Sequence, residues 1–298
     1  MSLSGVELGE VAGLLSALAW GTTGLLVRAH GPHLHAIVIN ALRCAISGSV
    51  FVVAWPFLSG RQPVPLAGWL LLVTSMVAAL VIGDSLYFEA LKRIGVARAM
   101  PISMGYPVLA SIGAVVLLHE RMGPLAAVGV LLTVGGVYLV ARPVNTTTTS
   151  SSRPQGRGYW LGVGMAAAAA VSWSFSTIAL GPPRELVDGP TASAIRTPIA
   201  SALLFLTARR AGVLPAMSHL RGRALAAIIL TGLTSVAATG FFMLSVALAG
   251  AGRAAVVTAT SPLFAVPISV VLLREPGSWR LVVGTVCSVI GVVLLAQS

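Results

Sequence analysis

The chain has 298 residues, of which 56% are hydrophobic and only 9% are charged, and its net charge is +11. A soluble domain carries about 25% charged residues, so this composition excludes a water-soluble fold. The basic residues stand singly or in pairs beside apolar stretches, which is typical of loops that face anionic lipid headgroups. We therefore expect the positive charge to face the lipid bilayer, and we expect the protein to bind no nucleic acid.

Apolar stretches of membrane-spanning length follow one another along the chain. A transmembrane helix needs about 20 predominantly apolar residues. We find ten such spans, near residues 11–27, 35–58, 66–91, 98–118, 124–141, 159–181, 191–208, 224–249, 253–273 and 279–296. The sequence thus predicts an all-α integral membrane protein with ten transmembrane helices, a multi-pass protein of the plasma or inner cell membrane.

The second five spans repeat the first five. The stretch LLHERMGPLAAVGVLLTVGGVYL at residues 117–139 recurs as LLREPGSWRLVVGTVCSVIGVVL at residues 272–294, with nine identical positions at an offset of 155. The same offset relates Gly95 to Gly250 and Pro107 to Pro262, and an offset of 153 relates Trp20 to Trp173 and Arg43 to Arg196. Each half is therefore expected to be a copy of one five-span unit.

An odd number of spans fixes how the two copies are related. After five spans the chain enters the second copy from the opposite side of the membrane, so the units should be inverted repeats around a central cavity. Residues 142–158 are rich in Pro, Gly, Thr and Ser and read as a flexible polar linker. The predicted domains are residues 1–141 and 159–298, with this linker between them.

Short motifs recur in the same order in both halves. Residues 19–21 read AWG and residues 172–174 read SWS. Each half also has an Arg in its second span, a Pro midway along its fourth span, and LLxE followed by VG and GV. The pattern resembles EamA-type members of the drug/metabolite transporter (DMT) superfamily. The resemblance implies ten helices around a central cavity and transport of small organic molecules, commonly the export of amino acids or other metabolites.

Two ionisable residues lie deep in the predicted spans of the first half. At about 1.5 Å per residue, Asp84 lies roughly 10 Å and Arg43 roughly 12 Å from the same side of the membrane, and Trp20 has a comparable depth. A charge in hydrocarbon is costly unless it is paired or wet, so we expect Arg43 and Asp84 to pair. Two interpretations stay open: an ion pair that only joins two helices, or a cavity wall that binds substrate. In the second, Asp84 exchanges protons, which are the candidate coupling ion.

Arg196 differs from its counterpart Arg43, because Thr239 stands at the position that matches Asp84. An arginine without a buried carboxylate can bind backbone carbonyls, water or the carboxylate of a ligand, which it grips with two hydrogen bonds. This asymmetry favours an amino acid or organic anion over a lipophilic cation as the small-molecule substrate.

Aromatic and hydroxyl side chains complete the candidate site. Trp20 and Trp173 are mid-span indoles that either line the cavity or only pack, and Tyr106 and Ser261 precede prolines that either free carbonyls for a ligand or merely kink the helix. The candidate substrate-binding residues are Trp20, Arg43, Asp84, Tyr106, Trp173, Arg196 and Ser261.

Glutamates and glycines mark the ends of each repeat. Glu120 and Glu275 end the fourth and ninth spans, where capping and loop geometry is the expected role. Pairs of glycines seven residues apart form a small face on the fifth and tenth spans, which indicates a scaffold or a dimer contact: Gly129 with Gly136, and Gly284 with Gly291. Both a monomer and a homodimer stay open.

Other function classes need features that we do not find. An enzyme needs a nucleophile with its base, a metal cluster or paired carboxylates, and an ATP-driven pump of the P-loop type needs GxxxxGK[ST]. We therefore expect a secondary transporter that works by alternating access, with no enzymatic activity, no cofactor and no metal. The alternatives are a passive channel and an exporter of cationic or lipophilic compounds.

Overall fold

The computed structural model describes residues 5–30, 34–58, 64–118, 123–143, 156–179, 187–214 and 220–296. This part of the chain forms helices and no strand. The helices are α1 (Gly5–His30), α2 (Ala36–Leu58), α3 (Leu66–Met76), the π-helix η1 (Val77–Gly83), α4 (Asp84–Ile94), α5 (Val96–Ser103), α6 (Tyr106–Leu118), α7 (Pro124–Ala141), α8 (Arg157–Ala179), α9 (Gly189–Arg210), α10 (Arg223–Ala249), α11 (Ala251–Thr258), α12 (Ser261–Leu272) and α13 (Trp279–Ala296).

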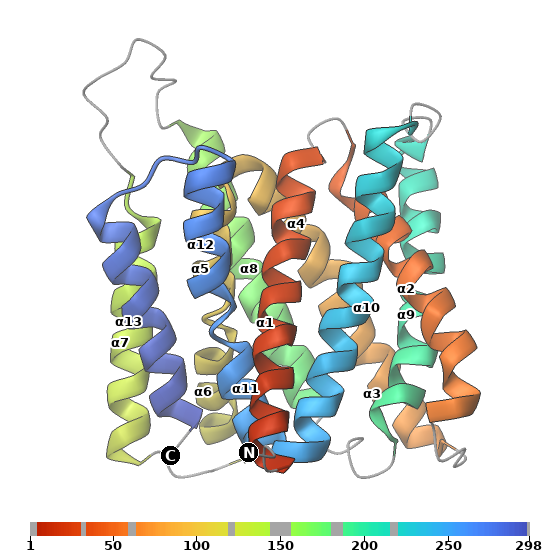
Figure 1. The fold of residues 1–298 in the computed structure, drawn as a ribbon, viewed down its shortest axis with the longest axis horizontal. Coiled ribbons are helices and arrows are strands. Elements are labelled where there is room, and N and C mark those ends of the chain that lie inside the picture. Colours follow the sequence, from red (N-terminus) through yellow and green to blue (C-terminus); the bar gives the residue numbers. More distant parts are fainter. Residues whose placement is uncertain are drawn as a thin grey trace.

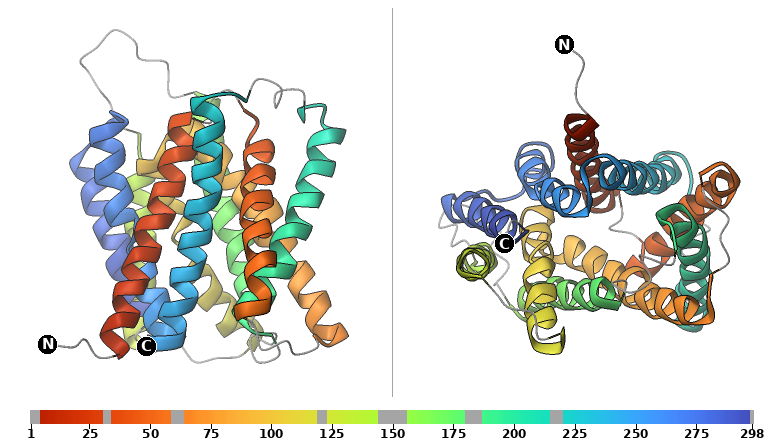
Figure 2. Two further views of the ribbon diagram at one scale, coloured as in Figure 1. Left: turned by 45° about the vertical axis from the view of Figure 1, so that its right-hand side comes forward. Right: turned by 90° about the horizontal axis from the view of Figure 1, so that it is seen from below.

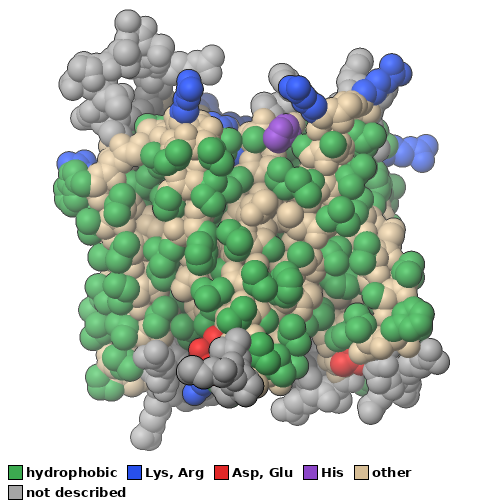
Figure 3. All heavy atoms as spheres, in the orientation of Figure 1, with side chains coloured by type: hydrophobic (Ala, Val, Ile, Leu, Met, Phe, Trp, Pro, Cys, Tyr) green, Lys and Arg blue, Asp and Glu red, His purple; other side chains and the backbone are tan. Residues whose placement is uncertain are grey.

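The helices stand side by side in one bundle (Figure 1). We call the end where α1 begins and α13 ends the terminal face, and the end where α1 finishes and α8 begins the distal face. Seen along the bundle, the helices surround a common centre (Figure 2). Hydrophobic side chains cover the flank between the two faces, whereas Lys and Arg gather near the distal face (Figure 3). This distribution fits a bundle that crosses a bilayer.

Seven helices in the described part are long and apolar enough to cross a membrane: Gly5–His30, Ala36–Leu58, Leu66–Ile94, Pro124–Ala141, Arg157–Ala179, Gly189–Arg210 and Arg223–Ala249. The chain is therefore an all-helical, multi-pass membrane protein. The count of ten spans stays a prediction. The predicted spans 98–118 and 253–273 are each divided into two short helices, so no uninterrupted helix of spanning length occurs there.

These two divided segments have the same geometry in both halves. Each begins after a glycine with positive φ, Gly95 at 81° and Gly250 at 86°, a conformation that glycine adopts without steric cost. Each is interrupted by a two-residue turn, at residues 104–105 and at residues 259–260, which again lie 155 positions apart. Non-helical backbone at membrane depth is tolerated where it is buried or lines a cavity. The breaks therefore point to the centre of the bundle.

Packing across the bundle joins equivalent elements of the two halves. Helix α1 packs against α10, α11 and α12, and α8 packs against the corresponding segments of the first half, from α3 to α6. Helix α2 packs against α9, and α7 against α13. The centre of the bundle is thus built by both halves together.

The glycine faces of α7 and α13 meet within the chain. A Cβ atom on Gly136 would lie 2.6 Å from the backbone nitrogen of Ser288, and one on Gly129 would lie 2.6 Å from the carbonyl oxygen of Gly291. Any larger residue would separate the two helices. In this chain the small faces therefore serve as an intramolecular scaffold.

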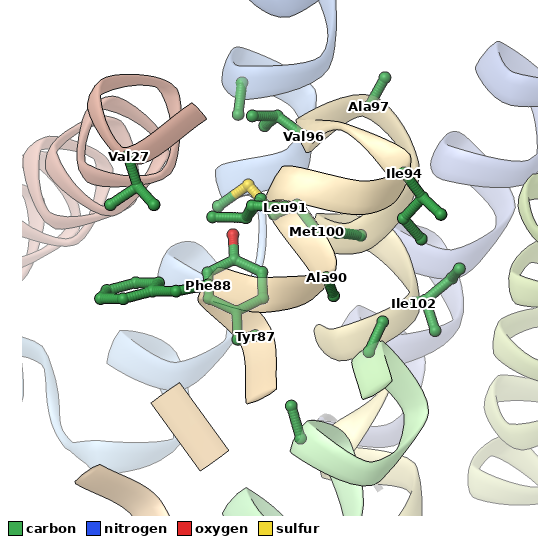
Figure 4. Packing of buried hydrophobic residues seen from close by; sticks show 14 of the residues in the cluster. Val27, Tyr87, Phe88, Ala90, Leu91, Ile94, Val96, Ala97, Met100 and Ile102 are labelled. Carbon is green, nitrogen blue, oxygen red and sulfur yellow. The ribbon is translucent and has the colours of Figure 1, made fainter. Parts of the chain in front are cut away.

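A cluster of buried apolar residues fills the distal part of the bundle. It includes Val27 from α1, Leu91 from α4, Val96 and Met100 from α5, and Leu281 from α13, each at most 2% exposed. Figure 4 shows the α1, α4 and α5 side chains of this cluster converging in one region. The cluster therefore lies between the centre of the bundle and the distal face.

Candidate substrate cavity

A cavity of about 310 Å³ lies at the centre of the bundle, with walls from both halves. All seven residues that the sequence singled out line it: Trp20, Arg43, Asp84, Tyr106, Trp173, Arg196 and Ser261. Both helix breaks also contribute to the wall, through Met104 and Ala259. The structure therefore brings the candidate residues together, and their binding of substrate stays a prediction.

The cavity extends toward the terminal face. Its lining reaches Thr177, close to the end of α8 at Ala179, and Ser193, close to the start of α9 at Gly189. Toward the distal face the lining stops at Met100 and Phe88, which belong to the buried apolar cluster. The cavity is thus closed on the distal side and approaches the surface on the terminal side.

Arg43 and Asp84 form a buried ion pair, as the sequence predicted. Arg43 is 3% and Asp84 6% exposed, and the Arg43 guanidinium donates to Oδ2 of Asp84. The second carboxylate oxygen, Oδ1, accepts a 3.0 Å hydrogen bond from the indole Nε1 of Trp173. Since Trp173 belongs to α8, the Asp84 carboxylate joins the two halves of the chain at the cavity.

Asn40 completes the surroundings of Arg43, and the sequence analysis missed it. Its Oδ1 accepts from Arg43 Nε at 3.2 Å and from the guanidinium NH2 group at 2.9 Å, while its Nδ2 donates to the Leu80 carbonyl at 2.6 Å. The Arg43 guanidinium carbon also lies 5.3 Å from the centroid of the Phe88 ring. The i, i+3 spacing of Asn40 and Arg43 on one helix was the signal that could have indicated this contact.

A π-helix places Asp84 in the cavity wall. The backbone N–H of Asp84 donates to the carbonyl of Ala79, five residues earlier, which is the π-helical pattern. Two carbonyls of η1 receive side-chain donors, Leu80 from Asn40 and Ala78 from Ser172 Oγ at 2.7 Å. Short π-helical segments are frequent at functional sites. The apolar run VAALVIG carries no sequence signal for this irregularity.

Arg196 has far fewer partners than Arg43. Its NH2 group donates to Ser75 Oγ at 2.9 Å, and its buried Nε has no hydrogen-bond partner. Ser75 in turn contacts Ser176 Oγ at 2.9 Å. Among the described residues, no carboxylate lies within 4.0 Å of Arg196, in agreement with the expectation from Thr239. The guanidinium therefore keeps hydrogen-bonding capacity in the cavity.

Three buried hydroxyls of the cavity wall also lack partners: Tyr87 OH, Thr258 Oγ1 and Ser261 Oγ. Tyr87, which the sequence analysis missed, has its ring centroid 5.2 Å from that of Trp173. The ring of Tyr106 also contacts Trp173, edge-on, at 6.1 Å and 84°. Buried polar groups in proteins are nearly always hydrogen-bonded, so the hydroxyls of Thr258 and Ser261 are available to water or a ligand. The hydroxyl of Tyr87 points instead toward Leu91 and Met100 of the apolar cluster (Figure 4).

The charges of the cavity do not balance. Arg43 and Asp84 compensate each other, which leaves the guanidinium of Arg196 as an excess positive charge in a site of low dielectric constant. An anionic group lowers the free energy of such a site. Within the described residues, no group of three or more His, Cys, Asp or Glu side chains could hold a metal ion.

Comparisons with known proteins agree with this architecture. The model of the EamA-like transporter family matches residues 7–142 and 160–297. An uncharacterized protein of Pseudomonas aeruginosa is 28% identical over 135 residues, which are 45% of this chain and 46% of that protein, so the match spans about half the length of this relative. A protein of known crystal structure shares the fold with a TM-score of 0.65 and 21% identity, over 96% of this chain and 95% of that chain.

Proposed function

Because the chain belongs to the EamA-like transporter family, as its sequence pattern predicted, we propose that it is a secondary carrier of small zwitterionic or anionic metabolites such as amino acids. Residues 1–141 and 159–298 act as inverted five-helix repeats joined by the linker 142–158. They expose the cavity to one side of the plasma or inner membrane and then to the other, and so export the substrate without ATP, cofactor or covalent chemistry.

The observation that carries this proposal is the state of Arg196. Among the described residues its guanidinium makes one hydrogen bond, to Ser75, and its buried Nε, at the cavity, has no partner. A carboxylate is a good complement for such a group, since its two oxygens match the guanidinium fork. Arg43 is less available for this role, because its Nε and NH2 groups already donate to Asn40 and Asp84.

The rest of the cavity suits the other end of such a substrate. When the substrate carboxylate binds Arg196, the ammonium or hydroxyl group of the substrate is left to contact the hydroxyls of Thr258 and Ser261. Rings of the wall, such as that of Trp173, supply apolar contact area. Asp84 remains the candidate proton carrier, and its direct contact with Trp173 of the other half gives a proton on Asp84 a route to affect how the halves pack.

Transport by the purified chain in liposomes tests the proposal. A panel of amino acids, 2-hydroxy acids and a lipophilic cation is offered with and without a proton gradient. We expect saturable flux of compounds that bear a carboxylate and no flux of their amides. Flux of the cation alone would exclude the proposed substrate class, and non-saturable flux of every solute would indicate a channel.

A further inference from the structure

Glu275 makes an unexpected contact at the distal face. It follows α12 and is 8% exposed. Its Oε1 accepts from the backbone N–H of Val96 at 3.0 Å, and its Oε2 from that of Ala97 at 2.8 Å. Val96 and Ala97 open α5, where a carboxylate is favourable because the first N–H groups of a helix have no intrahelical acceptor. Glu275 therefore has the capping role that the sequence predicted, but the helix that it caps belongs to the other half.

The same carboxylate connects further segments at this face. Arg28, near the end of α1, places its Nε 3.3 Å from Oε1 of Glu275 and donates from NH1 to the Lys92 carbonyl at 2.5 Å. Lys92 Nζ then donates to the carbonyl of Leu34, just before α2, at 2.7 Å. Four regions of the chain are thus tied together around one buried glutamate.

Two unusual backbone conformations flank this contact. Arg274, immediately before Glu275, has φ of 52°, the one positive φ among the described non-glycine residues. Gly95, immediately before α5, has φ of 81°, and a Cβ atom there would lie 2.6 Å from the Glu275 carboxyl carbon. The conformation of Arg274 is strained for a non-glycine residue, and such conformations persist only where the surrounding structure holds them and cluster at switch regions and ligand clamps.

The contact lies above the closed side of the cavity. Helices α5 and α12 reach the cavity at their inner ends, through Met100 and Ser261, and meet at Glu275 at their outer ends. Val96 and Met100 belong to the apolar cluster that closes the cavity, seen in Figure 4. Opening of the cavity at the distal face by separation of α5 from α12 breaks the Glu275 hydrogen bonds.

We propose that Glu275 is a gate residue, which holds the distal side of the cavity closed by binding the first N–H groups of α5 and Arg28, and which releases them when the cavity opens distally. This inference rests on the proposed alternating-access transport. A cap with a purely static role would lower stability when removed but would not change which face reaches the cavity. The repeat-related Glu120 lies outside the described residues.

Labelling of a cavity cysteine from each side tests this role. The two native cysteines are first removed as Cys44→Ala and Cys287→Ala. Thr23→Cys is then introduced, because Thr23 lines the cavity and is only 1% exposed, so the reagent has to reach it through the cavity. Membrane-impermeant maleimide is applied to vesicles of both orientations, with Gly5→Cys and Ala211→Cys proteins to identify the two faces. The matched control is Glu89→Gln, since Glu89 pairs at the same face with Lys92 and Arg93 of its own helix.

In Glu275→Gln we expect Thr23→Cys to react about tenfold faster from the distal face, the ratio that corresponds to about 1.4 kcal/mol. Arg28→Gln should give a smaller increase, because the two backbone hydrogen bonds remain. Glu89→Gln should react like the parent protein. An unchanged distal rate in Glu275→Gln overturns the proposal.

If Glu275→Gln does not fold, Arg28→Gln decides, and an unchanged distal rate in that variant overturns the proposal equally. The labelling needs no substrate, so its outcome is separate from that of the liposome experiment. A chain that transports nothing can still show the gate, and a transporter can lack it.

Discussion

Arg43 and Arg196 occupy matching positions in α2 and α9, yet their surroundings are opposite. Three groups hold Arg43: the amide of Asn40, the carboxylate of Asp84 and the ring of Phe88. At the repeat-related positions around Arg196 stand Ser193, Thr239 and Met243. Ser193 is shorter than Asn40, Thr239 lacks the charge of Asp84, and Met243 lacks the ring of Phe88. The halves thus share a helical framework, but only the first half satisfies its buried arginine, which leaves the second for a ligand.

The third span of each half shows the same contrast in the backbone. In the first half α3, η1 and α4 form one span with a π-helical segment just before Asp84, whereas α10 is a continuous α-helix through Thr239. Only the half that carries the carboxylate has the π-helix. We infer that this irregularity belongs to the Arg43 arrangement and not to the shared framework.

The largest expected effect comes from breaking the pair of the first half. Asp84→Asn leaves Arg43 uncompensated, and Arg43→Gln leaves Asp84 uncompensated. Each should lower the free energy of unfolding by roughly 3 to 5 kcal/mol, because an unpaired charge stays buried. Thermal unfolding in detergent measures this loss.

The double variant Arg43→Gln, Asp84→Asn separates two roles of the pair. It should recover most of the stability, because neutral side chains need no charged partner there. If it also regains full transport, the pair only joins helices and leaves our site. Strictly additive losses in the two single variants would show that the residues do not interact.

Asn40 offers the next largest effect. Asn40→Ala removes the amide oxygen that accepts two hydrogen bonds from Arg43 and the amide nitrogen that donates to the Leu80 carbonyl. It should lower the free energy of unfolding by about 1 to 3 kcal/mol. The matched change in the second half, Ser193→Ala, should stay within about 0.5 kcal/mol. Equal losses in the two variants would remove the asymmetry between the arginines.

Thr239→Asp makes the second half resemble the first. The new carboxylate lies at the position that matches Asp84 and should pair with Arg196, so it competes with the substrate. We expect carboxylate transport to fall about tenfold, the effect of about 1.4 kcal/mol, with no loss of thermal stability. Thr239→Asn is the control for size, and equal transport by both variants would contradict the competition.

Much of the fold followed from the sequence, because apolar runs and an internal repeat are strong signals. The depth of Arg43 and Asp84 along their helices predicted their pairing, and the neutral Thr239 predicted that Arg196 lacks a carboxylate. The depth of a residue in the membrane follows from its position along its own helix and needs no knowledge of the neighbouring helices. Residues that share a depth and a cavity were therefore found.

Features that depend on tertiary packing were missed. Asn40 looks like an ordinary polar residue in an apolar helix until the fold places Arg43 against it. The hydroxyl of Tyr87 is left without a partner only when α1, α4 and α5 pack around it. The backbone partners of Glu275, Val96 and Ala97, lie about 180 residues away in the other half of the chain. The division of the predicted spans 98–118 and 253–273 was also missed, since their prolines predicted kinks and not two-residue turns.

The prediction with the smallest effect concerns the orientation of the chain in the membrane, which changes neither stability nor flux. It determines the side of the membrane from which a substrate reaches Arg196. In the described part, basic residues gather at the distal face: Arg28, Lys92, Arg93, Arg98, Arg142, Arg157, Arg209, Arg210, Arg221, Arg223, Arg274 and Arg280. The positive-inside rule places this face in the cytoplasm. We expect impermeant maleimide outside intact cells to label Gly5→Cys and not Ala211→Cys. The reverse pattern would place the opening of the cavity in the cytoplasm.

The most direct test of the account is carboxylate transport by Arg196→Gln. Its single side-chain hydrogen bond, to Ser75, means that stability should change by no more than about 1 kcal/mol. Loss of the charged contact with two hydrogen bonds to the substrate carboxylate should lower flux about 10- to 100-fold. The flux of Arg196→Lys should lie between that of the parent protein and that of Arg196→Gln. Arg253→Gln is the matched control, because Arg253 is exposed and pairs with Glu10 outside the cavity. A folded Arg196→Gln protein that transports carboxylates as fast as the parent would contradict the account.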